Sequence, residues 1–129
     1  MSLVELTKDT FQDAITPDGT LIVDFWAPWC GPCRNFAPVF EKAAEKHTDI
    51  TFAKIDTDAE QELAGALGIR SIPTLMVFRE QVLLFSQPGA LSAGQFEELI
   101  GKIKEVDMAQ VHKEVAAAQQ AAANEPDAK

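Results

Sequence analysis

The stretch Phe25-Trp26-Ala27-Pro28-Trp29-Cys30-Gly31-Pro32-Cys33 contains the only two cysteines in a chain of 129 residues. It overlaps the end of an apolar run, residues 21–25, which predicts a β-strand. Residues 30–47 then carry apolar side chains at helical spacing, so both thiols are expected at the start of a helix. A strand that leads two thiols to a helix N-terminus is typical of thiol–disulfide exchange.

Length, composition and charge indicate which classes of protein the chain can belong to. The length fits one domain, and 47% hydrophobic residues are enough for a core without disulfide staples. A net charge of −9 disfavours nucleic-acid binding, because the chain would repel phosphate backbones. No apolar run is long enough to span a membrane, and the N-terminus lacks the basic-then-apolar order of a secretory signal. We therefore expect a cytoplasmic protein, where two cysteines serve catalysis or metal binding more often than structure.

The remaining elements follow from periodicity and turn residues. A short helix is expected over residues 7–15 with Thr7 as its N-cap, Gly68 should end a helix, and Ser92 should begin one. Pro38 lies inside the helix that follows the cysteines and should kink it. Helices then alternate with strands before a final hairpin and helix, which predicts an α/β fold with a mixed sheet. The expected strands are 21–25, 50–55, 74–78 and 82–85, and the further helices are 58–67 and 92–103.

The composition changes near the C-terminus. Apolar residues continue at a spacing of three and four through an Ala-rich segment, and residues 124–129 are expected to fray. We expect a domain at residues 1–106 and a helical extension at 107–129. The extension could prolong the last helix, dock on its own domain or bind a partner.

At Trp29-Cys30-Gly31-Pro32-Cys33 the chain resembles the thioredoxin family. The likeness covers roughly residues 5–103 and includes Asp24, Trp26, Pro38, Lys54, Asp58, the run Gly68-Ile69-Arg70-Ser71-Ile72-Pro73-Thr74, and Gly89-Ala90. The resemblance implies the thioredoxin fold, with a central mixed β-sheet flanked by helices in three α/β/α layers. Three features depart from the family pattern: a hairpin turn without glycine at Arg79-Glu80-Gln81, Pro88 before Gly89, and the extension beyond about residue 105.

The two cysteines are expected to have different roles in the exchange reaction. Cys30 lies at the N-terminal edge of the predicted helix, where free N–H groups and the helix dipole favour its thiolate, so it is the expected nucleophile. Cys33, one turn further on, should be less exposed and would resolve the mixed disulfide. The resemblance implies that Gly31-Pro32 between the cysteines goes with a reducing potential.

Asp24 and Lys54 are the next candidates. Asp24 lies among apolar strand residues, so burial should raise its pKa, and the resemblance implies that it accepts the proton of Cys33. A capping Asp at a strand end is the alternative. Lys54 matches the family lysine that modulates this Asp, and a solvated lysine on an edge strand is equally compatible with the sequence.

The resemblance also implies a substrate surface. It places a cis proline, Pro73, opposite the cysteines, although sequence statistics alone favour trans. The backbone of Ile72 would then pair with an extended substrate segment. The implied surface comprises Trp29, Gly31, Pro32, Ile72, Pro73, Gly89 and Ala90. Trp29 could instead pack in the interior, and Trp26 is expected to do so.

The leading hypothesis is a monomeric protein-disulfide reductase without a bound cofactor, which the family resemblance implies is re-reduced by NADPH through a flavoprotein thioredoxin reductase. Its clients would be proteins that contain disulfides. A zinc site is disfavoured, because only His47 and His112 remain as good further ligands. A structural disulfide is disfavoured by the short loop, and an oxidase or isomerase by the missing signal and the Gly-Pro pair. A binding or adaptor module that acts through the extension is the alternative function.

Overall fold

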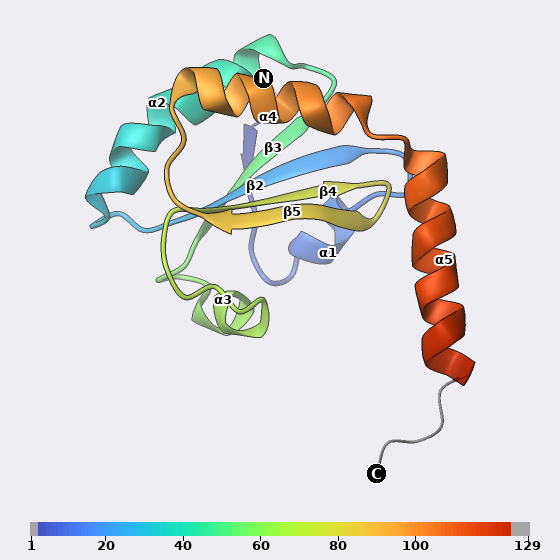
Figure 1. The fold of residues 1–129 in the computed structure, drawn as a ribbon. Helices are drawn as coiled ribbons and strands as arrows, with labels where there is room; N and C mark the ends of the chain where they lie inside the picture. Colours follow the sequence, from blue (N-terminus) through green and yellow to red (C-terminus); the bar gives the residue numbers. More distant parts are fainter. Residues whose placement is uncertain (1–2, 125–129) are drawn as a thin grey trace. The chain divides into compact units, whose positions relative to one another are not determined.

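The computed structural model describes residues 3–124 (Figure 1). The elements in order are β1 (Leu3–Glu5), α1 (Phe11–Ala14), β2 (Thr20–Trp26), α2 (Gly31–Lys46), β3 (Thr51–Asp56), α3 (Gln61–Ala66), β4 (Thr74–Arg79), β5 (Val82–Pro88), α4 (Ala93–Glu105) and α5 (Met108–Asn124). The chain divides into two compact units, residues 1–98 and 99–129, and the boundary falls inside α4.

The first unit contains one five-stranded sheet in the order β1-β3-β2-β4-β5. β1 and β2 both pair with β3 in parallel, whereas β2 with β4 and β4 with β5 are antiparallel. The sheet is therefore mixed, as the sequence predicts. β2 lies at its centre, and residues 21–25 are all buried because neighbouring strands and helices cover them.

Side chains alternate between the two faces of β2. Leu21, Val23 and Phe25 pack in one core cluster with residues of α1 and α3, including Phe11 and Leu63. Ile22 and Asp24 point to the other face, where α2 lies (Figure 1). The helices on both faces make the three α/β/α layers that the sequence predicts.

The α2 face is filled by phenylalanines. Phe40 of α2 lies 5.4 Å from Phe52 of β3 and 5.9 Å from Phe36, measured between ring centroids. Phe96 of α4 contacts all three rings at 5.4–6.3 Å. All four side chains are fully buried, so this cluster fixes α2, and with it the cysteines at the start of α2, against the sheet.

Two details at the N-terminus differ from the prediction. β1 was not expected, because three residues are too few to give a readable alternation, and it forms by pairing with β3. The prediction of Thr7 as the N-cap was also wrong. The helix begins at Phe11 after a turn in which the Thr7 carbonyl accepts hydrogen bonds from the N–H groups of Thr10 and Phe11.

The helix end predicted at Gly68 and the helix start predicted at Ser92 are confirmed, although α3 begins at Gln61, three residues after its predicted start. Gly68, at φ 72°, closes α3: its N–H donates to Gly65 O at 3.1 Å, and Ile69 N–H donates to Ala64 O at 2.9 Å. Ser92 caps α4 reciprocally, since Gln95 N–H donates to Ser92 Oγ and Ser92 N–H donates to Gln95 Oε1. α2 runs on through Pro38.

The hairpin between β4 and β5 turns in two residues. Arg79 pairs with Val82, and Glu80 and Gln81 between them have φ values of 51° and 68°. Two positive φ angles define a type I′ turn, which normally uses Asn-Gly. The structure therefore accommodates the missing glycine by holding two ordinary residues in the left-handed region. β5 continues to Pro88, three residues beyond its predicted end.

The second unit consists of the C-terminal part of α4 and all of α5. The Asp107 carboxylate accepts a hydrogen bond from Gln110 N–H at 3.2 Å, and so caps α5. The extension is thus helical through Asn124, as the sequence predicts. Fraying was predicted for residues 124–129. Asn124 is still helical, so the prediction is wrong there, and residues 125–129 lie outside the described residues. The division into domains 1–106 and 107–129 stays a prediction.

Candidate active site

The two cysteines occupy the first turn of α2. Cys30 is the N-cap, with extended backbone angles, and Cys33 is the third helical residue. The Cys33 N–H points at Cys30 Sγ at 3.2 Å, and the Cys30 N–H donates to the Ala27 carbonyl at 3.1 Å. Gly31 and Pro32 form the intervening turn, in which the missing N–H of Pro32 removes no helical hydrogen bond.

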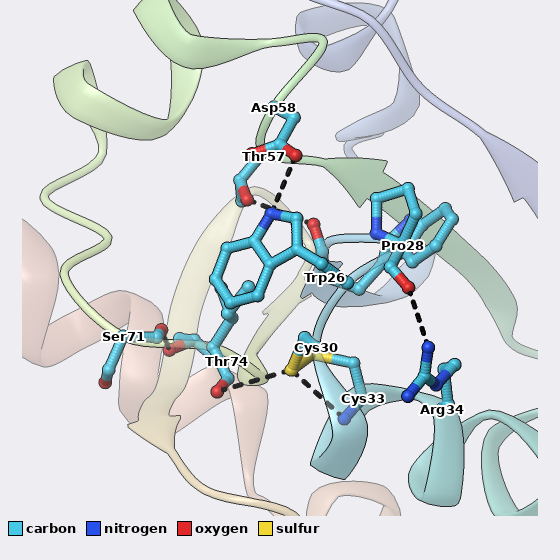
Figure 2. Close-up of a disulfide and its surroundings, with 11 residues drawn as sticks. Trp26, Pro28, Cys30, Cys33, Arg34, Thr57, Asp58, Ser71 and Thr74 are labelled. Atoms are coloured by element: carbon cyan, nitrogen blue, oxygen red, sulfur yellow. Dashed lines mark hydrogen bonds between the residues drawn. A yellow bond between two sulfur atoms is a disulfide. The ribbon is translucent and has the colours of Figure 1, made fainter.

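Cys30 and Cys33 are joined in a disulfide, with Cα atoms 5.2 Å apart (Figure 2). Both are buried, at 4% and 2% exposure, together with Ala27. Ile72 packs against this cluster, and its carbonyl oxygen lies 3.8 Å from Cys30 Sγ. The sulfur of Cys30 therefore lies beside the backbone that the sequence predicts as a substrate-pairing segment.

Pro73 and Gly89 meet next to this segment. The Ile72–Pro73 peptide bond is cis, as the resemblance implied. The Gly89 N–H donates to the Pro73 carbonyl at 2.8 Å, which ties the loop of Gly89 and Ala90 to Pro73. Gly89 has φ 111°, a conformation that other residues rarely adopt, so the backbone conformation explains why a glycine stands here.

Trp29 lies at the surface, with 66% of its area exposed. The alternative that it packs in the interior is therefore wrong. Its indole Nε1 donates to Asp58 Oδ2 at 2.8 Å. Asp58 is in turn oriented by a tight turn, since its N–H donates to Asp56 Oδ1 at 2.9 Å. Sequence analysis counted Asp58 among the residues of the family resemblance but did not assign it a site role.

Thr57 supports the same loop from the adjacent position. Its backbone N–H and its Oγ1 both donate to the Trp26 carbonyl, at 2.8 and 3.0 Å (Figure 2). The segment after β3 thus contacts both tryptophans of the active-site loop.

Asp24 lies in the middle of β2, paired in register with Lys54 of β3 and Leu75 of β4. The alternative of a capping residue at a strand end is therefore wrong. Its side chain is fully buried, and neither carboxylate oxygen accepts a hydrogen bond from the described residues. Burial raises the pKa of Asp24 from its ordinary value of 3.8 to about 7, and the charge of Lys54 offsets part of this rise.

Lys54 is half-buried on an interior strand, so it is not the solvated edge lysine that the sequence also allowed. Its Nζ lies 4.4 Å from the centroid of the Trp26 ring, a cation–π contact. Trp26 packs against the cysteine cluster on the same side of the sheet. Trp26 is thus a packing residue, as predicted, that also holds the ammonium group near Asp24.

The other residues of the implied substrate surface differ in how exposed they are. Pro32, Gly89 and Ala90 are exposed, Gly31 and Ile72 are half-buried, and Pro73 is buried. The structure brings the segments that carry them together through the contacts of Ile72 with Cys30 and of Pro73 with Gly89. Their role in binding substrate stays a prediction.

The residues considered for a zinc site are used elsewhere. His47 ends α2, and its Nε2 lies 2.8 Å from Glu97 Oε1. His112 is in α5. Within residues 3–124, no group of three or more His, Cys, Asp or Glu side chains is arranged to hold a metal ion.

A comparison with protein families matches the Thioredoxin family model to residues 2–105. The chain belongs to the thioredoxin family. Thioredoxin relatives agree: the chain is 40% identical to the thioredoxin of Bacillus subtilis over 103 residues, which cover 79% of this chain and 98% of that one. It is 41% identical to the thioredoxin of Porphyra purpurea over 104 residues, 79% of this chain and 97% of the relative.

A Streptomyces coelicolor protein named "Putative thioredoxin 2" is 53% identical over 115 residues, 89% of this chain and 86% of the relative. That alignment covers more residues than the family match, so it reaches past residue 105 into the extension. The extension is therefore at least partly shared with this relative.

Membership in the thioredoxin family, together with the paired cysteines, makes the chain a dithiol–disulfide oxidoreductase with disulfide-containing substrates. Thioredoxins carry out this chemistry with the cysteine pair itself and bind no cofactor. Within the described residues, no helix is long and apolar enough to cross a membrane.

Proposed function

We propose that the protein is a general protein-disulfide reductase that maintains the thiol redox balance of the cytoplasm. It acts as a monomer and receives electrons from NADPH through a flavoprotein thioredoxin reductase. The observation that carries the proposal is the Cys30–Cys33 pair at the start of α2, beside the Ile72 backbone and on the same side of the sheet as the buried carboxyl of Asp24.

Cys30 is the nucleophile in this proposal. In the reduced protein its thiolate is favoured by the N-terminus of α2, where the Cys33 N–H already points at its sulfur. The thiolate attacks one sulfur of the client disulfide. The client S–S bond breaks, its second sulfur leaves and takes up a proton, and a mixed disulfide joins Cys30 to the client.

Cys33 and Asp24 complete the cycle. Cys33 passes its thiol proton to Asp24 and attacks Cys30 Sγ, which breaks the mixed disulfide and expels the client sulfur as a thiolate. This thiolate takes up a proton, so the client leaves as a dithiol. Two electrons have then moved from the Cys30–Cys33 pair to the client. A carboxyl with a pKa of about 7 can accept and release this proton near neutral pH. Lys54 modulates its charge from the next strand.

The client lies on Trp29, Gly31, Pro32, Ile72, Pro73, Gly89 and Ala90. An extended client segment pairs with the backbone at Ile72, in the manner of an added strand. The exposed indole of Trp29, held by Asp58, offers apolar contact area at the edge. We also propose residues 1–106 as the thioredoxin domain and 107–129 as an extension, which fits a family match that ends at residue 105.

The test is the reduction of insulin disulfides by the protein with a bacterial thioredoxin reductase and NADPH, followed by NADPH consumption. We expect turnover by the wild type and none by Cys30→Ser. Cys33→Ser should instead accumulate a mixed disulfide between insulin and Cys30, visible by mass spectrometry. Turnover by the wild type no faster than that of Cys30→Ser would rule out the proposal.

A further inference from the structure

The charges around the cysteines differ from those of the whole chain. We define the redox surface as residues 27–40, 70–78 and 86–96, the segments that carry the cysteines, Pro73 and Gly89. The chain has 20 acidic residues and a net charge of −9, yet these segments contain no Asp or Glu. Their only charged residues are Arg34 and Arg70. The redox surface thus carries a net positive charge, although the whole chain is net negative.

Arg34 is held beside the cysteines. It directly follows Cys33, and its backbone N–H donates to the Cys30 carbonyl at 3.1 Å. Its Nη1 donates to the Pro28 carbonyl at 3.4 Å, which holds the guanidinium along the loop that leads to Trp29 and Cys30 (Figure 2). Because that contact uses one of five N–H groups, the others are free to bind an incoming carboxylate.

Arg70 lies on the other segment that borders the disulfide. It is exposed and precedes by two residues Ile72, whose carbonyl lies 3.8 Å from Cys30 Sγ. Within the described residues, neither Arg70 nor Arg34 forms an ion pair with a carboxylate. Both positive charges are therefore available to a bound client.

Asp58 is a carboxylate that contacts the redox surface, through Trp29. Its Oδ2 accepts the indole hydrogen bond of Trp29, and in Figure 2 Asp58 and Arg34 lie on different sides of Cys30. The Asp58 carboxylate is thus engaged by Trp29, whereas neither arginine has a carboxylate partner among the described residues.

We propose that Arg34 and Arg70 select client segments that carry Asp or Glu next to the disulfide. This rests on the proposed reductase function. The net charge of −9 repels acidic clients at long range, but physiological salt screens such repulsion beyond about 8 Å. At contact distance the guanidinium groups dominate. Exposed Arg–carboxylate pairs are weak, so each arginine should change the rate constant by about threefold.

The test uses three peptides that contain the same intramolecular disulfide and differ only in the flanking residues, which are Glu, Gln or Lys. Pre-reduced protein is mixed with excess peptide at 0.15 M salt, and oxidation of the Cys30–Cys33 pair is followed by tryptophan fluorescence. This single-turnover rate needs no reductase. The wild type should react fastest with the Glu peptide and slowest with the Lys peptide.

The variants are Arg34→Gln, Arg70→Gln, their combination, and Arg34→Lys, which keeps the charge. In the double variant, the rate constant for the Glu peptide should fall about tenfold, that for the Gln peptide should stay unchanged, and that for the Lys peptide should rise. Arg34→Lys should retain most of the preference. Lys42→Gln changes net charge equally from an exposed position further along α2 and should leave the order of the peptides unchanged.

Equal rates on the three peptides, or an equal loss on all three in the double variant, would overturn the selectivity. Failure of the wild type to reduce even the Gln peptide would instead contradict the reductase function itself. Disappearance of the preference in 1 M salt is expected, because the Debye length is then about 3 Å.

Discussion

Asp24, the proposed proton acceptor, is placed where ionisation costs stability. A fully buried carboxyl without a hydrogen-bond donor is expensive to ionise, and among the described residues the half-buried Lys54 is the countercharge beside it. The resulting pKa of about 7 suits a group that exchanges a proton near neutral pH. The same shift means that folding becomes less favourable once the carboxyl must lose its proton.

The consequence for stability has a definite sign. The pKa of Asp24 is raised in the folded state, so the folded protein binds more protons than the unfolded chain between pH 3.8 and about 7. Its free energy of unfolding should therefore fall as pH rises through this window and level off above it. At pH 8 the full penalty is roughly 4 kcal/mol.

Asp24→Asn should remove this penalty. We expect the oxidised variant to be more stable than the wild type at pH 8, and the difference to shrink towards pH 4, because both side chains are then neutral. Urea unfolding of both proteins at pH 4, 6 and 8 measures this difference in the free energy of unfolding. A difference that stays constant with pH would show that Asp24 does not titrate in this range.

Sequence analysis assigned the cysteines and Asp24 from local chemistry and the other site residues from the family resemblance, whereas the contact of Asp58 is a tertiary one. Cys30 and Cys33 are readable because two thiols at a helix start have few other uses, and Asp24 because an acid stands in an apolar strand. Asp58 could not be assigned in this way. Its role depends on the hydrogen bond to Trp29, 29 residues away, which no local pattern encodes.

At the scale of elements, strongly periodic segments were predicted and short or strained ones were not. The apolar run of β2 and the stripe of α2 agree with the structure to within a few residues. β1 has only three residues, and its pairing with β3 rather than its own propensity makes it a strand. The type I′ turn at Glu80 and Gln81 was equally unreadable, because neither residue favours positive φ.

This turn offers a stability test. Gln81→Gly should relieve the left-handed strain at φ 68° and raise the free energy of unfolding by about 0.5–1 kcal/mol, the net of relieved strain and added freedom in the unfolded chain. As a matched control, Gln87→Gly in β5 should lower stability by a similar amount, because the extended strand gains nothing from glycine. Urea unfolding of the two oxidised variants gives both values. Destabilisation by Gln81→Gly would contradict the strain at this turn.

At the scale of the molecule, the alternation of helices and strands predicted an α/β fold with a mixed sheet, but not the strand order. The order β1-β3-β2-β4-β5 depends on which strands find partners far along the chain. It matters for function, because it makes β2 the central strand and places Asp24 in the interior, beside Lys54 on β3. The family resemblance implied only that Lys54 lies near Asp24, and the strand order was not predicted.

The central claim is that electrons leave the Cys30–Cys33 pair for client disulfides. The most direct test is a redox titration of the whole protein against glutathione mixtures, with the thiol and disulfide forms separated after alkylation. We expect a reduction potential near that typical of thioredoxins, about −270 mV, so that the pair reduces glutathione-poised clients. A potential close to that of a strong oxidant, about −120 mV, would reverse the direction of electron flow and contradict a reductase role.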